Sequence, residues 1–451
     1  MPDMDIKGLQ FAIFGMGESG VDTAEFLLRR GARVRAVDRQ SLEALKPDHA
    51  RRLDAAQVPL VAQDEAALAG VDIALLSPGV TPNLPLFDEA RRRGIKVTGE
   101  LEFCSRFLRG PILGITGSNG KTTTTALCAH LLKASDIAVQ VGGNIGLPLA
   151  AMLDSSREDQ WNVLELSSFM LELADTLHVA VATILNVTPD HLDRHGNIEN
   201  YTEAKRRILR NQTSLDAAVL NAENPLSRES AAFTHGAVYQ FSASGRVERG
   251  FWMEAGDLIA NGEYWMPLAE VQLQGRHNVE NVLAAGCCAH LAGAPLPALR
   301  RAVASFPGVE HRIEFVRELN GVRYYNDSKG TNVDATVKAL ESFASGIWLI
   351  LGGRDKASDY APLRPLIEAR GREVLLIGEA TPIIAAQLAG LSVPVTSCGD
   401  MASAVTYASA RVKPGDVVLL SPACASFDQY SGYNERGRHF KTLVQQLEEE
   451  G

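Results

Sequence analysis

Residues 114–125 read GITGSNGKTTTT, an order typical of a strand end, a glycine-rich turn and the start of a helix. In such a turn, glycines let successive backbone N–H groups point at phosphate oxygens, and the following helix adds the positive end of its dipole. Lys121 would balance phosphate charge and Thr122 would hold Mg²⁺, although Ile115 stands where the usual motif has glycine. The alternative is an ordinary glycine-rich turn, but the stretch as a whole predicts an ATP site. Its expected phosphate-binding residues are Gly117, Ser118, Asn119, Gly120, Lys121, Thr122 and Thr123.

On both sides of this turn, apolar strands alternate with amphipathic helical stretches along three segments of the chain. Such alternation predicts parallel sheets, so the expected fold class is α/β with three domains. These are a Rossmann-like domain over 1–109, a central ATPase-type P-loop domain over 110–309 and a Rossmann-like domain over 310–451. Within the central domain, 236–273 alternates aromatic and polar residues around glycine turns, which indicates a small antiparallel addition.

The first segment carries a second glycine-rich turn, in residues 11–20, FAIFGMGESG. An apolar strand runs into Gly15, Gly17 and Gly20, and Asp38 ends the next apolar run, which is the fingerprint of a dinucleotide-binding βαβ unit. A turn of this kind suits any diphosphate, so the fingerprint alone does not distinguish UDP from NAD. An NAD-dependent oxidoreductase would explain this segment, but it would leave the GSNGKTT turn without a purpose.

The composition limits the possible partners. The 451 residues are 46% hydrophobic, which suits a globular protein, and 44 basic against 54 acidic residues give a net charge of −10. This balance argues against general affinity for nucleic acids or membrane surfaces. The N-terminus lacks the pattern of a signal peptide, and no apolar run approaches the ~18 residues needed for membrane insertion. Six cysteines without metal-ligand spacing indicate reduced thiols, so we expect a cytoplasmic protein.

Further motifs follow the ATP turn in a specific order, and together they resemble the Mur ligases of bacterial peptidoglycan synthesis. In that family the turn reads TGSNGKT, as it does here, and the resemblance covers essentially the whole chain. The motifs that carry it are GGNIG (142–146), LELSSF (164–169), LNVTPDHLDRH (185–195), NDSKGTN (326–332) and LLSPACASFDQY (419–430).

The resemblance implies an ATP-dependent, amide-bond-forming ligase. The motifs are most similar to those of the member that adds D-glutamate to UDP-N-acetylmuramoyl-L-alanine through an acyl phosphate. A cytoplasmic monomer in cell-wall precursor synthesis, and hence in cell shape and division, is then expected. Folylpolyglutamate-type ligases share the phosphate loop and remain an alternative, although GGNIG and LSPACASFDQY point away from them. A non-catalytic, ATP-gated binding module would explain the loop but not the paired metal candidates described next.

Besides Thr122, three residues carry the metal hypothesis. Glu165 ends a predicted strand, where a carboxylate suits Mg²⁺, although it could instead be a helix N-terminal carboxylate. From the residues alone, His191 reads as a solvated loop histidine and Lys205 as part of a basic, solvated helix face. The resemblance reverses both interpretations: it implies two Mg²⁺ ions and a Lys205 carbamylated by CO₂. The implied metal ligands are Thr122, Glu165, His191 and Lys205, and the implied catalytic residues are Lys121, Lys205 and His191.

The remaining site residues also follow from the resemblance. The rest of the ATP site is implied to be Asn278, Asn281, Arg312 and Asp327, with the third domain closing over the nucleotide. From position alone, the two asparagines could bind a ligand or merely cap a helix. The implied UDP-sugar residues are Gly15, Met16, Gly17, Glu18, Ser19, Asp38, Arg39, Ser77, Pro78, Gly79, Asn144 and His191. The implied glutamate residues are Lys329, Thr331, Lys356, Ser426, Phe427 and Tyr433, of which the last two could be ordinary packing residues.

Overall fold

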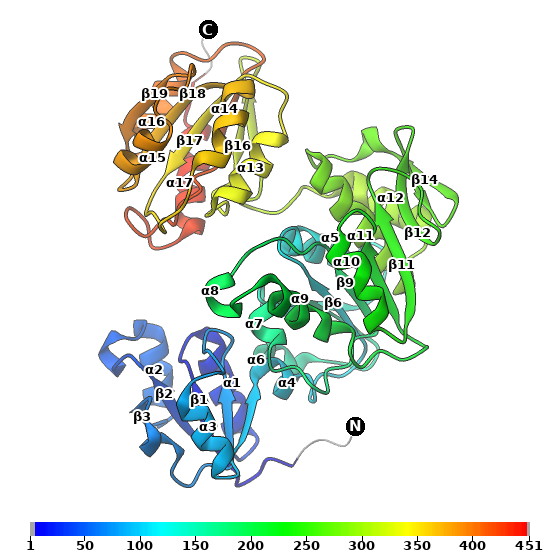
Figure 1. Ribbon diagram of the computed structural model, residues 1–451, viewed down its shortest axis with the longest axis vertical. Coiled ribbons are helices and arrows are strands. Elements are labelled where there is room, and N and C mark those ends of the chain that lie inside the picture. The colour runs from blue at the N-terminus through cyan, green and yellow to red at the C-terminus, as the bar shows by residue number, and fades with distance from the viewer. Residues whose placement is uncertain (1–4, 449–451) are drawn as a thin grey trace. The chain divides into compact units, whose positions relative to one another are not determined.

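A computed structural model describes residues 5–448 (Figure 1). The chain folds into two compact units, each with its own apolar core. Unit 1 comprises Met1–Glu270 and Glu280–Ala304 and holds two sheets, whereas unit 2 comprises Val271–Val279 and Ser305–Gly451 and holds a third. No helix within residues 5–448 is long and apolar enough to span a bilayer.

The first sheet of unit 1 is entirely parallel, with the strand order β3-β2-β1-β4-β5. Its strands are β1 (Gln10–Phe14), β2 (Arg33–Asp38), β3 (Leu60–Ala62), β4 (Ile73–Leu76) and β5 (Lys96–Gly99). Its helices are α1 (Glu18–Arg29), α2 (Pro47–Ala55), α3 (Pro85–Arg92) and α4 (Glu100–Cys104). The central strands β1 and β4 are apolar on both faces because helices cover both faces of a parallel sheet.

The second sheet of unit 1 has nine strands in the order β14-β13-β12-β11-β10-β9-β6-β8-β7. They are β6 (Ile112–Thr116), β7 (Val139–Gly143), β8 (Trp161–Glu165), β9 (Val181–Ile184), β10 (Ala217–Asn221), β11 (Ala237–Ser242), β12 (Gly250–Glu254), β13 (Asp257–Ala260) and β14 (Glu263–Pro267). The helices of this region are α5 (Lys121–Lys133), α6 (Leu149–Met152), α7 (Ser168–Leu171), α8 (Leu192–His195), α9 (Ile198–Arg206), α10 (Pro225–Glu229), α11 (Arg276–Leu291) and α12 (Leu296–Ser305).

One part of the expected antiparallel addition is wrong. The segment 236–273 does supply the antiparallel pairs β12–β13 and β13–β14, but β11 lies parallel to both β10 and β12. The reason is the connection: β10 leads to β11 through α10, and a helical crossover returns the chain in the same direction. The alternation of aromatic and polar residues predicts a half-exposed strand but not its direction.

Unit 2 contains a six-stranded sheet in the order β15-β16-β20-β17-β18-β19. The strands are β15 (Glu314–Leu319), β16 (Val322–Asn326), β17 (Ile347–Gly352), β18 (Gly371–Ile377), β19 (Val395–Gly399) and β20 (Val417–Leu420). The helices are α13 (Val333–Glu341), α14 (Arg364–Arg370), α15 (Thr381–Gln387), α16 (Met401–Ser409) and α17 (Tyr433–Gln445). The expectation of a purely parallel sheet is wrong here, because β15 and β16 form an antiparallel hairpin. Its turn is Asn320-Gly321, and both residues have positive φ, as a two-residue hairpin turn of this kind requires.

The carboxyl ends of the parallel strands carry the loops that matter for function. Within unit 1, β1 runs into Gly15, β4 into Ser77, β6 into Gly117 and β7 into Asn144. Ligands bind in open α/β sheets at this end of the strands, so the fold of unit 1 places both glycine-rich turns where a ligand can reach them.

Candidate functional site

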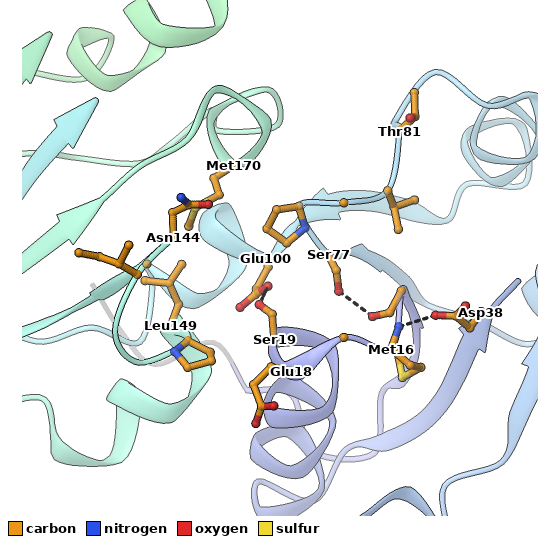
Figure 2. Close-up of a pocket in the computed structure, with 18 of the residues that line it drawn as sticks. Met16, Glu18, Ser19, Asp38, Ser77, Thr81, Glu100, Asn144, Leu149 and Met170 are labelled. Carbon is orange, nitrogen blue, oxygen red and sulfur yellow. Dashed lines mark hydrogen bonds between the residues drawn. The ribbon is translucent and has the colours of Figure 1, made fainter. Parts of the chain in front are cut away.

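A cavity of about 630 Å³ lies in unit 1 (Figure 2). Its wall combines the first glycine-rich turn with the loops after β2, β4 and β7. The predicted UDP-sugar residues that line it are Gly15, Met16, Gly17, Glu18, Ser19, Asp38, Arg39, Ser77, Pro78, Gly79 and Asn144. His191, also predicted for this ligand, is not among the lining residues. Residues from widely separated parts of the sequence therefore meet at one concave surface.

Close backbone packing shapes the glycine turn of this cavity. Gly15 has φ +93°, and its carbonyl accepts a hydrogen bond from the Ser77 hydroxyl at 2.9 Å. The Met16 N–H donates to an Asp38 carboxylate oxygen at 2.7 Å, so Asp38 fixes the turn rather than only facing the cavity. A Cβ at Gly20 would lie 2.1 Å from the Gly15 carbonyl oxygen, which shows how closely α1 approaches the turn. A side chain at Gly20 is thus excluded, and the backbone of the turn forms part of the cavity wall.

The first turn of α1 is held by a buried histidine. His49 contacts the Met16 carbonyl oxygen at 3.1 Å and a Glu18 carboxylate oxygen at 2.9 Å. Arg52 donates to the other Glu18 oxygen at 2.9 Å. The hydrogen bond from His49, together with the charges of His49 and Arg52, lowers the pKa of Glu18. Glu18 is therefore an anchored carboxylate at the cavity edge.

Several lining residues were missed by the sequence analysis. They are Gln63, Val80, Thr81, Glu100, Gly143, Ile145, Gly146, Pro148, Leu149 and Met170. Glu100 directly follows β5, so the rule that ligands lie at strand carboxyl ends could have identified it. Gly143, Ile145 and Gly146 lie in the GGNIG motif, which could have identified them, whereas Pro148 and Leu149 are apolar residues that no motif distinguishes from core residues.

The ATP turn lies between β6 and α5, as predicted. Gly120 caps α5 with φ +83°, and the Lys121 ammonium donates to the carbonyl oxygens of Gly117 at 2.8 Å and Ser118 at 2.9 Å. The Asn119 N–H donates to the Asn186 side-chain oxygen at 2.8 Å, which ties the turn to the chain after β9. Ile115, the departure from the usual motif, is a buried residue of β6.

Lys205 is a buried residue, so its interpretation as part of a solvated helix face is wrong. It is 1% exposed, and its ammonium donates to the Gly117 carbonyl oxygen at 2.9 Å and lies 4.3 Å from the ring centre of Tyr201. Burial lowers the pKa of Lys205 well below its usual value, and the nearby charge of Lys121 lowers it further. Two lysines thus converge on one carbonyl of the phosphate turn.

Glu165 and His191 differ sharply in their surroundings. Glu165 is buried at the end of β8; one carboxylate oxygen accepts from the Asn144 side-chain amide at 2.8 Å, and the other has no partner. It does not cap the following helix, because Ser167 does so. The His191 side chain is 49% exposed, and its Nε2 atom lies 3.5 Å from a carboxylate oxygen of Asp190. The backbone of His191 has φ +53°. Asn144 therefore joins the cavity wall to the candidate metal ligand Glu165.

The two predicted asparagines have separate partners. Asn281, in unit 1, accepts a hydrogen bond from the Thr124 hydroxyl at 3.2 Å, and a Cβ at Gly120 would lie 2.3 Å from its side-chain oxygen. It is therefore beside the ATP turn. Asn278 belongs to the segment grouped with unit 2, where its amide donates to the Gln274 carbonyl oxygen at 2.7 Å.

Within unit 2, the NDSK and SPACASF loops lie together. Asp327 is buried and accepts from the Ser421 hydroxyl at 2.7 Å, and burial raises the pKa of Asp327 to about 6 despite the opposing charge of Arg312. Lys356 donates to the Thr331 carbonyl oxygen at 3.3 Å.

Aromatic residues and a buried cation complete this part of unit 2. The Lys329 ammonium lies 5.6 Å from the ring centre of Tyr433. Ser426 is buried, whereas Phe427 is 62% exposed and so is not a packing residue. Arg436, which the sequence analysis missed, is fully buried and donates to carbonyl oxygens of both loops, including that of Ser328 at 2.8 Å. An arginine within an amphipathic helix gives no sequence signal for such a role.

Comparison with known proteins now adds to this geometry. Three family models match in order: "Mur ligase MurD-like, N-terminal domain" over 9–99, "Mur ligase middle domain" over 115–289 and "Mur ligase, glutamate ligase domain" over 311–424. The UDP-N-acetylmuramoylalanine–D-glutamate ligase of Solibacter usitatus is 48% identical over 99% of both chains. The chain belongs to the Mur ligase family. The ligase of the same name from Acidobacterium capsulatum is 47% identical, covering 98% of this chain and 97% of its own.

Solved structures support the fold of this Mur ligase. The UDP-N-acetylmuramate–alanine ligase of Thermotoga maritima matches with a TM-score of 0.62 at 19% identity, covering 97% of this chain and 99% of its own. A pseudomurein peptide ligase of Methanothermus fervidus matches with a TM-score of 0.58 at 17% identity, covering 98% and 100%. The mixed α/β architecture with three sheets is therefore that of the Mur ligases.

Proposed function

We propose that this Mur ligase uses ATP to join D-glutamate to UDP-N-acetylmuramoyl-L-alanine, a step of peptidoglycan precursor synthesis. The observation that carries the proposal is the presence of two glycine-rich turns at strand carboxyl ends of unit 1. One lines a cavity of about 630 Å³, and the other carries Lys121. An NAD-dependent oxidoreductase needs only the first turn. Two such turns suit two nucleotides: ATP, which is consumed, and the UDP-sugar, which carries the acceptor.

The finer fold assignments belong to the same proposal. We assign 1–109 as a Rossmann-like domain that binds the UDP-sugar, 110–309 as the P-loop ATPase-type domain and 310–451 as a second Rossmann-like domain. The strand order β3-β2-β1-β4-β5 supports the first assignment, and the strand–turn–helix unit around Lys121 supports the second. The diphosphate would lie at Gly15–Ser19, with the muramoyl end toward Asn144.

The residues around the ATP turn suit Mg²⁺, which prefers oxygen ligands. The unpartnered carboxylate oxygen of Glu165 is buried, and such an oxygen is costly unless a cation or donor meets it. We assign Thr122, Glu165, His191 and Lys205, the last as a carbamate, to hold two ions. When bound, Mg²⁺ would neutralise negative charge on the transferring phosphoryl group.

The carbamate assignment has support from the environment of Lys205. A buried amine next to Lys121 has no solvent to stabilise its charge, and conversion to a carbamate would replace two neighbouring cations by an ion pair. The assignment explains why a lysine occupies this position in the chain's interior.

The reaction would then proceed in two steps. The γ-phosphoryl group passes from ATP to the carboxylate of the alanyl residue, giving an acyl phosphate, and Lys121 stabilises the charge in transit. The glutamate amine next attacks the acyl carbon and phosphate leaves. We assign the glutamate to Lys329, Thr331, Lys356, Ser426, Phe427 and Tyr433, and the remaining nucleotide contacts to Asn278, Asn281, Arg312 and Asp327. Lysine and hydroxyl donors suit the two carboxylates of the incoming amino acid.

A phosphate-release assay tests this function. Release should require ATP, UDP-N-acetylmuramoyl-L-alanine and D-glutamate together, with L-glutamate as the matched control. Strong ATPase activity without either acceptor would contradict the ligase assignment, and a change in NADH absorbance would favour the oxidoreductase. We also expect the activity in the cytoplasm, where ATP and the UDP-sugar are available, from a monomer without a nucleic-acid partner.

A further inference from the structure

Glu100 is a buried carboxyl group in the wall of the cavity. It directly follows β5, is 2% exposed and lines the cavity beside Ser19 (Figure 2). One carboxyl oxygen accepts a hydrogen bond from the Ser19 hydroxyl, whereas Oε1 is buried and has no hydrogen-bond partner among residues 5–448. A buried polar atom in this state has a large desolvation penalty, which a bound ligand could relieve.

Burial and one neighbouring carboxylate favour the neutral form of Glu100. On α1, which packs nearby, Asp22 faces it with a negative charge, whereas the hydrogen bond donated by Ser19 favours the ionised form. On α4 itself, Cys104 is buried close by. Glu102 also lies on α4, and β5, which packs against it, contributes Lys96 at its opposite end. Glu172 and Arg194, which form an ion pair with each other, line a smaller pocket together with Glu100. Burial, aided by Asp22, raises the pKa of Glu100 to about 7.

The same cavity wall contains the start of α1. This twelve-residue helix begins at Glu18 without a side-chain cap, and helix starts of this kind attract phosphate. An ionised Glu100 beside Ser19 would repel such a phosphate, because two negative charges would share one desolvated site. A protonated Glu100 would remove that repulsion and supply a donor.

We propose that Glu100, in its protonated form, donates a hydrogen bond from its carboxyl O–H to a diphosphate oxygen of the UDP-sugar. This inference rests on the proposed function of the cavity. It adds one residue whose protonation state determines how tightly the UDP-sugar binds. Binding then takes up a proton wherever free Glu100 is ionised. The affinity for the UDP-sugar should therefore fall as the pH rises through neutrality.

Calorimetric titration with UDP-N-acetylmuramoyl-L-alanine tests this proposal. The diphosphate of this ligand is a diester and does not titrate near neutrality. A change of affinity with pH therefore comes from the protein, either from Glu100 or from groups around the carboxylate at the far end of the ligand. Between about pH 6 and about pH 8.5, the Kd of the unmodified protein should rise roughly tenfold or more. Repeating the titration near pH 8 in buffers of different ionisation enthalpy should reveal uptake of close to one proton, without any variant.

Two variants separate Glu100 from the other ionisable groups of the protein. Glu100→Gln keeps an N–H donor but cannot ionise, so it should bind within a few-fold of the unmodified protein at low pH and lose most of the pH dependence. Glu102→Gln is the matched control, since Glu102 is buried on the same helix but pairs with Arg106 outside the cavity. It should keep the pH dependence.

The outcomes are distinct. Equal pH dependence in the unmodified protein and Glu100→Gln would overturn the proposal, and so would an affinity that strengthens with pH, because the carboxylate would then accept from the ligand. Absence of UDP-sugar binding by the unmodified protein at every pH would instead refute the proposed function of the cavity.

Discussion

For the substitution Gly20→Ala, helix propensity and packing predict opposite changes in stability. Gly20 lies within α1, where alanine is ordinarily more stable than glycine by about 1 kcal/mol. In this structure, however, the added Cβ would lie 2.1 Å from the Gly15 carbonyl oxygen and 3.1 Å from the Ser77 hydroxyl oxygen. The first of these contacts is with backbone, so no side-chain rotation relieves it.

The magnitude follows from these two contributions. Forcing a methyl group into a packed site costs about 1–3 kcal/mol or more, and the hydrogen bond from Ser77 to Gly15, which the shift would disturb, contributes about 1 kcal/mol. After subtracting the helix gain, Gly20→Ala should destabilise the protein by about 1–3 kcal/mol. At about 2–4 °C per kcal/mol, the unfolding midpoint should fall by several degrees.

Differential scanning calorimetry measures this change, and Gly17→Ala is the matched control. Gly17 is three residues earlier, has φ −73°, and a Cβ there would meet nothing within 4 Å. Its midpoint should therefore fall only by the cost of alanine at the N-cap of α1, which is less than the fall for Gly20→Ala. UDP-sugar affinity should fall with Gly20→Ala, because the displaced Gly15 lines the cavity. A rise in the midpoint for Gly20→Ala would refute the close approach of α1 to the turn.

The other predictions concern charge. Lys121→Ala should lower turnover by about 10²–10³-fold and leave UDP-sugar affinity unchanged in calorimetry; an equal loss of affinity would contradict the separation of the two turns. Lys205→Ala should abolish turnover without unfolding the protein, and added formate should partly restore its activity. Lys205→Glu should retain more activity than Lys205→Arg. Near-normal activity of Lys205→Ala would refute the carbamate assignment. Because folding raises the pKa of Glu100 from 4.5 to about 7, its stabilising contribution is complete below about pH 4.5 and is lost as the pH rises to 7. Relative to Glu100→Gln, the unmodified protein should lose about 3 kcal/mol over this range in urea unfolding; a constant difference would contradict the shift.

Much of the fold was predictable from local pattern. The apolar runs that become β1, β6, β8, β17 and β20 are bounded by glycines or polar residues, and α5, between β6 and β7, follows a recognisable turn. Strands without such a run were not predictable. The edge strand β3 is apolar but only three residues long, too short for a period to be read, and its existence depends on pairing with β2. The Asn320-Gly321 pair was a usable hairpin signal that the strand–helix pattern outweighed.

The candidate site likewise contains residues that local sequence pattern predicts and residues that it does not. The residue pattern predicted the glycine turn of the cavity and Asp38, because a strand–turn–helix unit displays its backbone geometry in the sequence, whereas Ser77–Gly79 and Asn144 followed from the family resemblance. Burial of Lys205 and Arg436 was not predictable, since each lies in a helix of mixed charge and its environment is made by distant segments. The family resemblance, rather than the residue pattern, led to Lys205.

The hydrogen bonds of Lys121 bear on how the ATP turn would work. Its ammonium donates to the Gly117 and Ser118 carbonyl oxygens, so a phosphate that engages Lys121 must replace these contacts. Bonds between an ammonium and an ionised phosphate are stronger than bonds to neutral carbonyls, so the exchange is favourable. Gly117 would keep a donor throughout, because Lys205 also donates to its carbonyl oxygen. The nitrogen of the buried Lys205, which keeps an N–H in the carbamate, can thus hold the turn in shape while the ammonium of Lys121 moves to the nucleotide.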